Sequence, residues 1–226
     1  MKILEKAVTK LGNEITLLGE PGEDNALIIG VFHGDEPQGK WLIEEYIKQY
    51  IPLPLPLAPC DKGGKELLFI PCLNPDGMAQ STRTNTNGVD LNRNFPTKNW
   101  GENKGENATC DDENSSYYGG KTPASEIETQ FVINIIEKYN PTFILTLHTP
   151  YKVVNYDGPA KDTAEKISEI INYPVEASIG YPTPGSFGTY CGVERNIPTI
   201  TLEMDENCPV EELFPPICKI FETLIK

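Results

Sequence analysis

Basic side chains are scarce in this chain, which has only two histidines and three arginines among its 226 residues. Lysine and arginine together number 19, against 33 aspartates and glutamates, and the formal net charge is -14. Nucleic acid and anionic lipid surfaces are polyanions that need a basic face on their protein partner. The charge balance therefore argues against nucleic acid and against a membrane surface as partners.

Long apolar runs are also missing. The first 19 residues contain no apolar stretch long enough for the core of a signal peptide, and acidic residues interrupt them early. No part of the chain approaches the roughly 20 consecutive apolar residues of a membrane-spanning helix. We therefore expect a cytoplasmic protein that does not cross a membrane.

Closely spaced cysteine pairs are a third absence, since the chain contains no CxxC motif. Scattered cysteines in a reducing compartment are expected to be free thiols. The six cysteines are Cys60, Cys72, Cys110, Cys191, Cys208 and Cys218.

The hydrophobic content of 38% is nevertheless sufficient for a sizeable core, and the length suits one domain spanning residues 1–226. Apolar runs that end at turn signals predict buried strands at 25–32, 65–74, 142–148 and 197–204. Amphipathic stretches predict helices at 40–50, 123–139 and 162–172. This alternation favours an α/β fold, with a mostly parallel, mixed and twisted sheet that carries helices on both faces.

Prolines suggest where two of the helices begin or break. Thr122 is a candidate N-cap for the helix at 123–139, with Pro123 at its first position. A last helix within 209–226 is expected to be interrupted by Pro215 and Pro216.

One long segment, residues 75–121, is rich in Asn, Thr, Gly and Asp and has neither helical nor strand periodicity. Loops of this length inside a compact domain are usually functional. The segment 51–59, in which proline alternates with apolar residues, is instead expected to be an extended surface connection.

Both histidines lie at the ends of predicted buried strands, where sites form in open α/β sheets. His33 begins the tetrapeptide HGDE, so a turn can bring Glu36 to the same side as His33. Two histidines and one carboxylate are a usual ligand set for a catalytic zinc ion. His33, Glu36 and His148 are therefore candidate zinc ligands, and Asp35 could orient a ligand or substrate group.

Two of the three arginines fall in the polar loop, within RTNTNGVDLNRNFP (83–96). The guanidinium group binds a carboxylate in two places, which lysine cannot do. Arg83 and Arg93 are therefore candidates for binding an anionic substrate. Glu203 ends a predicted buried strand, where a carboxylate is costly unless it has a partner or a function.

Five segments occur in an order that resembles the zinc carboxypeptidase family. They are HGDE (33–36), NPDG (74–77), R-x-N-x-x-GVDLNRNFP (83–96), LTLH (145–148) and TLE (201–203). The match runs from about residue 30 to residue 205, and NPDG with GVDLNRNF is its most specific part. The resemblance implies the fold of that family, a metallopeptidase activity and one zinc ion per chain, bound by His33, Glu36 and His148.

The same resemblance implies roles for residues around the metal. Arg83 would stabilise the oxyanion of the tetrahedral intermediate, and Glu203 would act as general base. Asn92 and Arg93 would bind the free carboxylate of the substrate. Tyr181 is the nearest candidate for the tyrosine that closes over substrate in digestive members of the family.

The segment GYPTPGSFGTYCG (180–192) resembles the branch of the family that acts on bacterial murein peptides. That likeness implies hydrolysis of the bond between γ-D-glutamate and diaminopimelate, during recycling of cell-wall peptides. The partner would be a small peptide with a free carboxylate. Ser186 is a candidate donor to a polar substrate group, and the sequence leaves both a monomer and a homodimer open.

Three alternatives remain on the sequence alone. N-acyl amino acid deacylases of the succinylglutamate desuccinylase or aspartoacylase type share an HxxE, a DLNR-like segment and a later histidine, although NPDG and PTPGSFG favour a peptidase. A non-catalytic binder would be expected to lack a metal ligand or the base, and neither is missing. A structural zinc site would be richer in cysteine.

Overall fold

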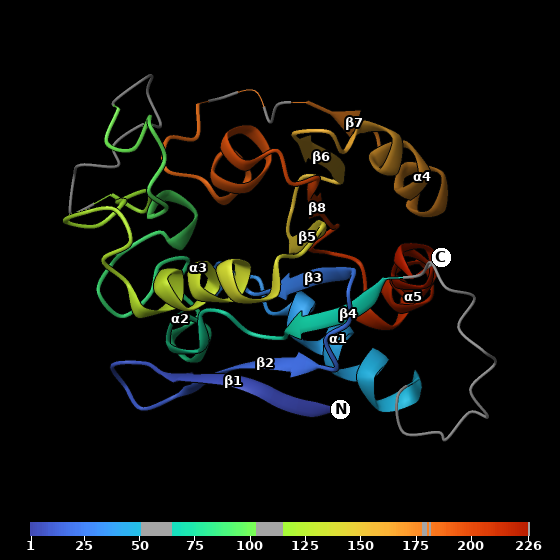
Figure 1. Cartoon of the computed structure of the whole chain (residues 1–226), viewed down its shortest axis with the longest axis horizontal. Coiled ribbons are helices and arrows are strands. Elements are labelled where there is room, and N and C mark those ends of the chain that lie inside the picture. The colour runs from blue at the N-terminus through green and yellow to red at the C-terminus, as the bar shows by residue number, and fades with distance from the viewer. Residues whose placement is uncertain (51–64, 103–114, 178–179, 181, 226) are drawn as a thin grey trace.

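Eight strands form one mixed sheet in the order β1-β2-β4-β3-β5-β8-β6-β7 (Figure 1). The computed structural model of the chain describes residues 1–50, 65–102, 115–177, 180 and 182–225. The strands are β1 (Lys2–Val8), β2 (Glu14–Gly19), β3 (Asn25–Gly30), β4 (Glu66–Ile70), β5 (Phe143–His148), β6 (Val153–Asp157), β7 (Val175–Glu176) and β8 (Thr199–Glu203).

The four central strands, β4, β3, β5 and β8, run parallel to one another. They correspond within a few residues to the four predicted strands, which are confirmed. All six residues of β3 and all six of β5 are buried, as expected for strands covered on both faces. Because these strands are parallel, their carboxyl ends meet at one edge of the sheet.

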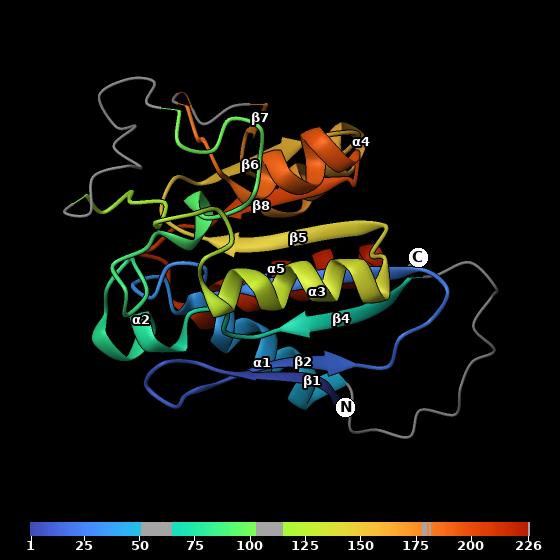
Figure 2. The same ribbon diagram turned by 60° about the vertical axis from the view of Figure 1, so that its left-hand side comes forward.

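Helices cover both faces of the sheet, which confirms the predicted fold class (Figure 2). One face carries α1, α4 and α5, and the other carries α3 and the short turns η1 and η2. The helices are α1 (Gln38–Tyr50), α2 (Pro75–Gln80), η1 (Leu91–Arg93), α3 (Ile127–Tyr139), α4 (Lys161–Ile171), η2 (Thr189–Val193) and α5 (Val210–Leu224).

Successive side chains of a strand point to opposite faces of the sheet, which divides the core into two clusters. In β5, Leu145 and Leu147 pack toward α1 and α5, whereas Ile144 packs toward α3. Each face is mainly apolar in this region, so burial of both faces drives the sheet to form between the helices. The core thereby fixes the strand ends from which the polar groups of the candidate active site project.

The predicted start of the helix at 123–139 is wrong by four residues. The helix α3 begins at Ile127, with Glu126 in the N-cap position. Residues 122–125 form a turn, since the backbone amide of Ala124 donates to the Asn94 carbonyl at 2.6 Å and the Asn94 side chain donates to the Thr122 carbonyl at 3.2 Å. These contacts with a distant loop override the local N-cap signal.

The expected interruption of the last helix is also wrong, because α5 is continuous through Pro215 and Pro216. Each proline removes only one backbone donor and forces a local adjustment. The apolar face of the helix, which includes Ile217, Ile220 and Phe221, is fully buried against the sheet. That burial outweighs the lost hydrogen bonds.

Several elements escaped the sequence analysis. The hairpin of β1 and β2, the strands β6 and β7, and the helix α2 were not predicted. The helix α2 lies in the NPDG motif, where the Asn74 side chain accepts a hydrogen bond from the Gly77 amide at 2.9 Å. The segment 51–59, expected to be a surface connection, lies outside the described residues.

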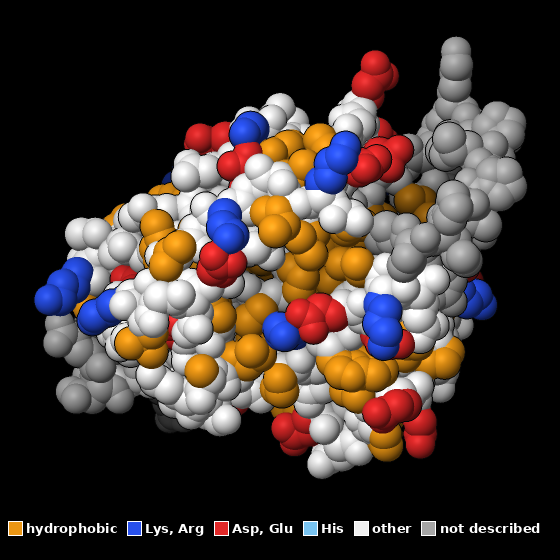
Figure 3. All heavy atoms as spheres, turned by 90° about the horizontal axis from the view of Figure 1, so that it is seen from below, with side chains coloured by type: hydrophobic (Ala, Val, Ile, Leu, Met, Phe, Trp, Pro, Cys, Tyr) orange, Lys and Arg blue, Asp and Glu red, His pale blue; other side chains and the backbone are white. Residues whose placement is uncertain are grey.

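The edge strand β1 borders a face on which hydrophobic groups alternate with scattered charges (Figure 3). Ile3, Val8 and Leu11 are exposed. Lysines and a glutamate on the strand itself oppose edge-to-edge pairing with other chains. Among the described residues, no helix is long and apolar enough to cross a membrane, and the cysteines Cys72, Cys191, Cys208 and Cys218 are free.

Candidate active site

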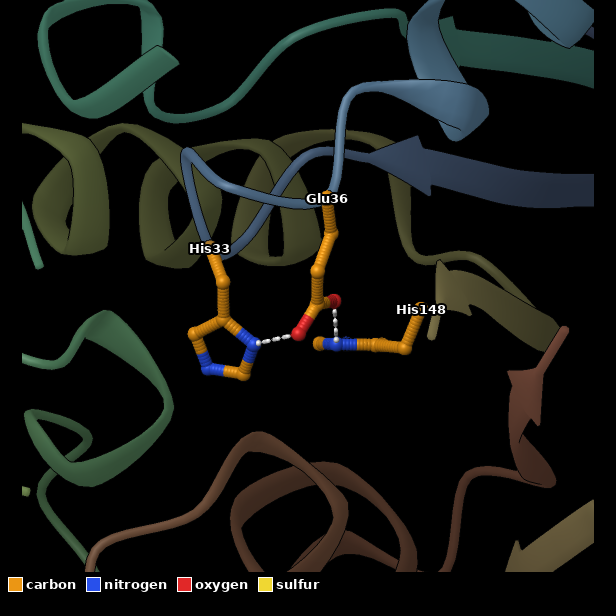
Figure 4. Close-up of side chains that lie close together, drawn as sticks. All are labelled: His33, Glu36 and His148. Carbon is orange, nitrogen blue, oxygen red and sulfur yellow. Dashed lines mark hydrogen bonds and ion pairs between the residues drawn. The ribbon is translucent and has the colours of Figure 1, made fainter. Parts of the chain in front are cut away.

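The three predicted metal ligands come together at the carboxyl edge of the sheet (Figure 4). His33 and Glu36 lie in the turn between β3 and α1, where the Glu36 amide donates to the His33 carbonyl at 3.2 Å. His148 is the last residue of β5. One ligand atom from each of the three buried side chains lies within 4.8 Å of the others, so the cluster can hold a metal ion.

Glu36 lies between the two histidines. Its Oε1 is 2.8 Å from Nδ1 of His33, and its Oε2 is 3.0 Å from Nδ1 of His148. Burial disfavours the charged carboxylate, but the two imidazoles outweigh this and hold the pKa of Glu36 below its usual range. Two nitrogen donors and one carboxylate suit zinc and leave a coordination position for water or substrate.

Asp90 orients the first of these ligands. Its Oδ1 lies 3.2 Å from Nε2 of His33, on the side of the ring away from Glu36. Burial disfavours the His33 imidazolium, but the carboxylates of Glu36 and Asp90 raise the pKa of His33 to about 9. A carboxylate behind a ligating histidine fixes the orientation of the ring. The sequence analysis missed Asp90, although it lies inside the GVDLNRNF motif.

Arg83 reaches this cluster through the same aspartate. Its Nε and Nη2 donate to Oδ2 of Asp90 at 3.1 and 2.9 Å. Asp90 thus joins Arg83 to His33, and its burial requires both partners. The guanidinium group of Arg83 also lies over the ring of Tyr117, 5.1 Å from the centroid.

Glu203 ends β8 directly beside His148, its partner in the parallel register. Burial raises the pKa of Glu203. Its Oε2 is buried and has no hydrogen-bond partner among the described residues. A buried carboxylate oxygen without a partner is costly, which indicates that it normally contacts a water molecule, a metal-linked group or a substrate. This orphaned oxygen beside the cluster fits a metal site that activates water.

A cavity of about 240 Å³ opens beside these groups. Its lining includes His33, Glu36, Arg83, Asn92, Arg93 and Glu203, together with Asp35, Tyr117, Thr149, Pro150, Tyr151 and Glu206. The structure therefore brings the predicted arginines, Asn92 and Glu203 to one cavity.

Ser186, a predicted substrate-binding residue, is not among the residues that line this cavity. The Ser186 hydroxyl lies 2.9 Å from that of Thr189 and accepts from the Thr189 amide at 3.2 Å, at the start of η2. Tyr181 lies outside the described residues. Tyr117 and Tyr151 do line the cavity, and Tyr151 follows His148 by three residues. Its short distance in sequence from the candidate ligand His148 could have identified Tyr151 as a residue of the cavity.

The chain is similar in sequence to known proteins. The model of the zinc carboxypeptidase family matches residues 6–179. Murein peptide amidase A of Escherichia coli K12 is 36% identical over 149 residues, 65% of this chain and 57% of that protein. The protein of the same name from Vibrio campbellii is 39% identical over 146 residues, 58% of this chain and 54% of that protein. The chain thus spans little more than half the length of these curated relatives.

Solved structures agree in fold. The murein-tripeptide amidase from Escherichia coli O157 superposes with a TM-score of 0.77 and 26% identity, over 97% of this chain and 90% of that one. Carboxypeptidase A from Helicoverpa armigera has a TM-score of 0.76 over 97% of this chain and 67% of that one. At 13% identity this second likeness concerns the fold alone. With its family model matched over residues 6–179, the chain belongs to the zinc carboxypeptidase family.

Proposed function

We propose that this chain is a zinc-dependent amidase that hydrolyses the bond between γ-D-glutamate and diaminopimelate in murein peptides. One observation carries the proposal: the His33, Glu36 and His148 cluster lies beside Glu203, whose Oε2 has no partner among the described residues, in a cavity that also holds two arginines. The relatives named murein peptide amidase support the choice of substrate. Cytoplasmic recycling of cell-wall peptides belongs to the same proposal.

The metal would be held by one nitrogen each from His33 and His148 and by the carboxylate of Glu36. Zinc supplies Lewis acidity at neutral pH, which makes water a better nucleophile and polarises a carbonyl group. Asp90 keeps His33 oriented toward the metal through the ring nitrogen that does not face Glu36.

Glu203 is the proposed general base. Its orphaned Oε2 is free to accept a proton from an attacking water molecule and to deliver it to the leaving amine. Because burial raises the pKa of Glu203, the carboxylate is a stronger base than an exposed glutamate. The carboxylate position at the end of β8 is fixed by the backbone ladder with β5.

The two arginines have separate proposed roles. Arg83 lies near the metal cluster, where negative charge develops on the scissile carbonyl, and would stabilise that charge. Arg93 and Asn92 would bind the free carboxylate of the substrate and so position the scissile bond. The backbone amide of Phe187 donates to Asn92 Oδ1 at 2.9 Å, which leaves the Asn92 amide nitrogen available to substrate.

The experiment that tests this proposal is hydrolysis of L-Ala-γ-D-Glu-diaminopimelate by the purified, zinc-loaded protein. Free diaminopimelate is followed by chromatography, alongside a panel of C-terminal peptides and N-acyl amino acids. We expect rapid release that a chelator abolishes and added zinc restores. Preferential hydrolysis of N-acyl amino acids would replace the proposal with the deacylase alternative.

A further inference from the structure

The polar segment between Arg83 and Asp90 has both of its ends in the candidate active site. Its middle is held by Asn85, a buried side chain with 4% of its surface exposed. Asn85 Oδ1 accepts from the backbone amides of Asn87 and Val89 at 3.0 and 3.1 Å. The Asn85 backbone amide also donates to the Val89 carbonyl at 2.9 Å. These bonds close the segment into a loop that brings Arg83 and Asp90 together.

The Asn85 side chain also ties this loop to the start of α3. Its Nδ2 donates to Oε2 of Glu126 at 2.7 Å and lies 3.3 Å from Oε2 of Glu128. Asn87 Nδ2 donates to the same Glu126 oxygen at 2.7 Å. The contact therefore joins residues that are 41 positions apart in the chain.

Glu126 is suited to this anchoring role. It is 5% exposed, and no ion pair of its carboxylate is found in the described part of the chain. The Ser125 hydroxyl donates to its other oxygen at 2.6 Å. The amides of Asn85 and Asn87 and the Ser125 hydroxyl thus give both oxygens of this buried carboxyl group a hydrogen-bond partner.

The substrate-binding half of the loop has a different anchor. Asn92 and Arg93 lie beside residues 185–187, where the Phe187 amide donates to Asn92 Oδ1 and the Phe95 amide donates to the Gly185 carbonyl at 3.0 Å. Neither of these contacts involves Asn85 or Glu126. Asp90 links the two halves, since the backbone amides of Asn92 and Arg93 donate to it at 2.9 Å. Asn92 and Arg93 nevertheless keep their contacts with residues 185–187 when Asn85 is changed, so the change is expected to disturb Arg83 and Asp90 more.

We propose that Asn85 and Glu126 are positioning residues, which fix Arg83 and Asp90 relative to His33 and thereby set both zinc affinity and the rate of the chemical step. Neither residue lines the cavity with the metal ligands. The inference rests on the roles proposed above for Arg83 and for the metal cluster. It assigns a function to the asparagine of the R-x-N-x-x-GVDLNRNFP motif.

The test compares two identical substitutions of equally buried asparagines. Asn85→Ala removes the anchor, and Asn25→Ala is the matched control. Asn25 is also 4% exposed and bonds to the Gly22 and Tyr139 backbone, but it lies at the opposite end of β3 from the site. The zinc dissociation constant is measured by chelator competition, the melting temperature on the metal-free protein, and kcat and KM on the murein tripeptide.

We expect Asn85→Ala to weaken zinc binding about 10- to 100-fold, as loss of a supporting contact behind a metal ligand typically does. Its kcat should fall by a similar factor, while KM changes less than about threefold because Arg93 keeps its own anchor. Asn25→Ala should lower the melting temperature but leave zinc affinity and kcat within about twofold of the wild type. Equal zinc affinity and equal kcat in the two variants would overturn the proposal.

Two further variants keep the test decisive if Asn85→Ala fails to fold. Glu126→Gln keeps an oxygen that accepts from Asn85 and should retain most of the zinc affinity, whereas Glu126→Ala should lose it. Asn85→Asp keeps the size and the two bonds from backbone amides but loses the donor to Glu126, so it should resemble Asn85→Ala. If the wild type does not cleave the tripeptide, the proposed function fails, and the zinc affinities alone still decide this inference.

Discussion

Two regions supply the candidate active site, and they hold their side chains by different means. His148 and Glu203 end neighbouring strands, so the backbone ladder of β5 and β8 fixes their separation. Arg83 and Arg93 lie in a loop whose shape depends on side-chain hydrogen bonds. The ends of β5 and β8, with the turn after β3, carry the groups proposed for metal binding and proton transfer. The loop carries the groups proposed to contact charge on the substrate.

This difference indicates which changes each region tolerates. A substitution at a strand end leaves the ladder intact, so it removes one functional group without moving its neighbours. A substitution in the loop can also displace other groups, because each buried amide or carboxylate there has several partners. A single substitution at a strand end is therefore expected to remove one function, whereas one in the loop is expected to alter several groups at once. The sizes of the two effects are expected to differ as well.

The largest effect on kcat is expected from substitution of Glu203, at the end of β8. Glu203→Gln should lower kcat by about a thousandfold or more, since it removes a general base without changing side-chain size. Zinc binding should persist, because the metal ligands are unchanged. The measurement is single-turnover hydrolysis with zinc content determined on the same sample. Substitution of an exposed residue of α4, Glu169→Gln, is the control. Retention of more than a tenth of the activity would remove Glu203 from the role of base.

In the loop, Arg83→Ala should lower kcat by about 10²- to 10³-fold, as loss of a group that stabilises developing charge does. Arg83→Lys should restore little of this, because lysine cannot reproduce the two bonds to Asp90. If lysine restored full activity, a single positive charge would be sufficient and the paired geometry would be irrelevant. Steady-state kinetics on the tripeptide distinguish these outcomes.

A smaller effect, and one confined to binding, is expected at the second loop arginine. Arg93→Ala should raise KM about 10- to 100-fold with a modest change in kcat, since it removes a contact that is present before the transition state. Arg195→Ala is the control, because Arg195 packs on Tyr190 away from the cavity. An unchanged KM in Arg93→Ala would exclude the role of Arg93 as carboxylate anchor.

The last expected effect is on stability and depends on pH. Burial raises the pKa of Glu128 from 4.5 to about 7 in the folded protein. The stabilisation from this bound proton is complete below about pH 4.5 and is lost as the pH rises through 7, which amounts to about 3 kcal/mol. The side chain introduced in Glu128→Gln does not titrate. The free energy of unfolding of this variant minus that of the wild type should therefore increase between pH 4.5 and 8.

Urea unfolding at several pH values measures this difference directly. The comparison uses the wild-type free energy of unfolding minus that of Glu128→Gln, so that other titrating groups cancel. A difference that stays constant between pH 4.5 and 8 would show that Glu128 titrates as an ordinary carboxyl group.

The sequence predicted the strand-borne part of the site well, for a physical reason. Apolar runs such as those of β3 and β5 are local signals, and a polar residue at the end of such a run lies at the sheet edge wherever the strand packs. His33 and His148 could therefore be placed together from the sequence alone. The resemblance to a family added the roles proposed for Arg83 and Asn92.

The loop-borne part could not be predicted in the same way. Asp90 and Glu126 act through contacts with distant residues, and no local pattern encodes a hydrogen bond across 41 positions. The same contacts explain the wrong start of α3, because Asn94 fixes the turn that precedes it. Ser186 was expected at the substrate, but it is not among the residues that line the cavity, and its hydroxyl accepts from the Thr189 amide.

The most direct test of the account is a crystal structure of zinc-loaded Glu203→Gln with the intact murein tripeptide. The account predicts zinc bound by His33, Glu36 and His148, with the diaminopimelate carboxylate on Arg93 and Asn92 and the scissile carbonyl oxygen facing Arg83. A metal bound by other residues, or a substrate carboxylate bound away from Arg93, would contradict it.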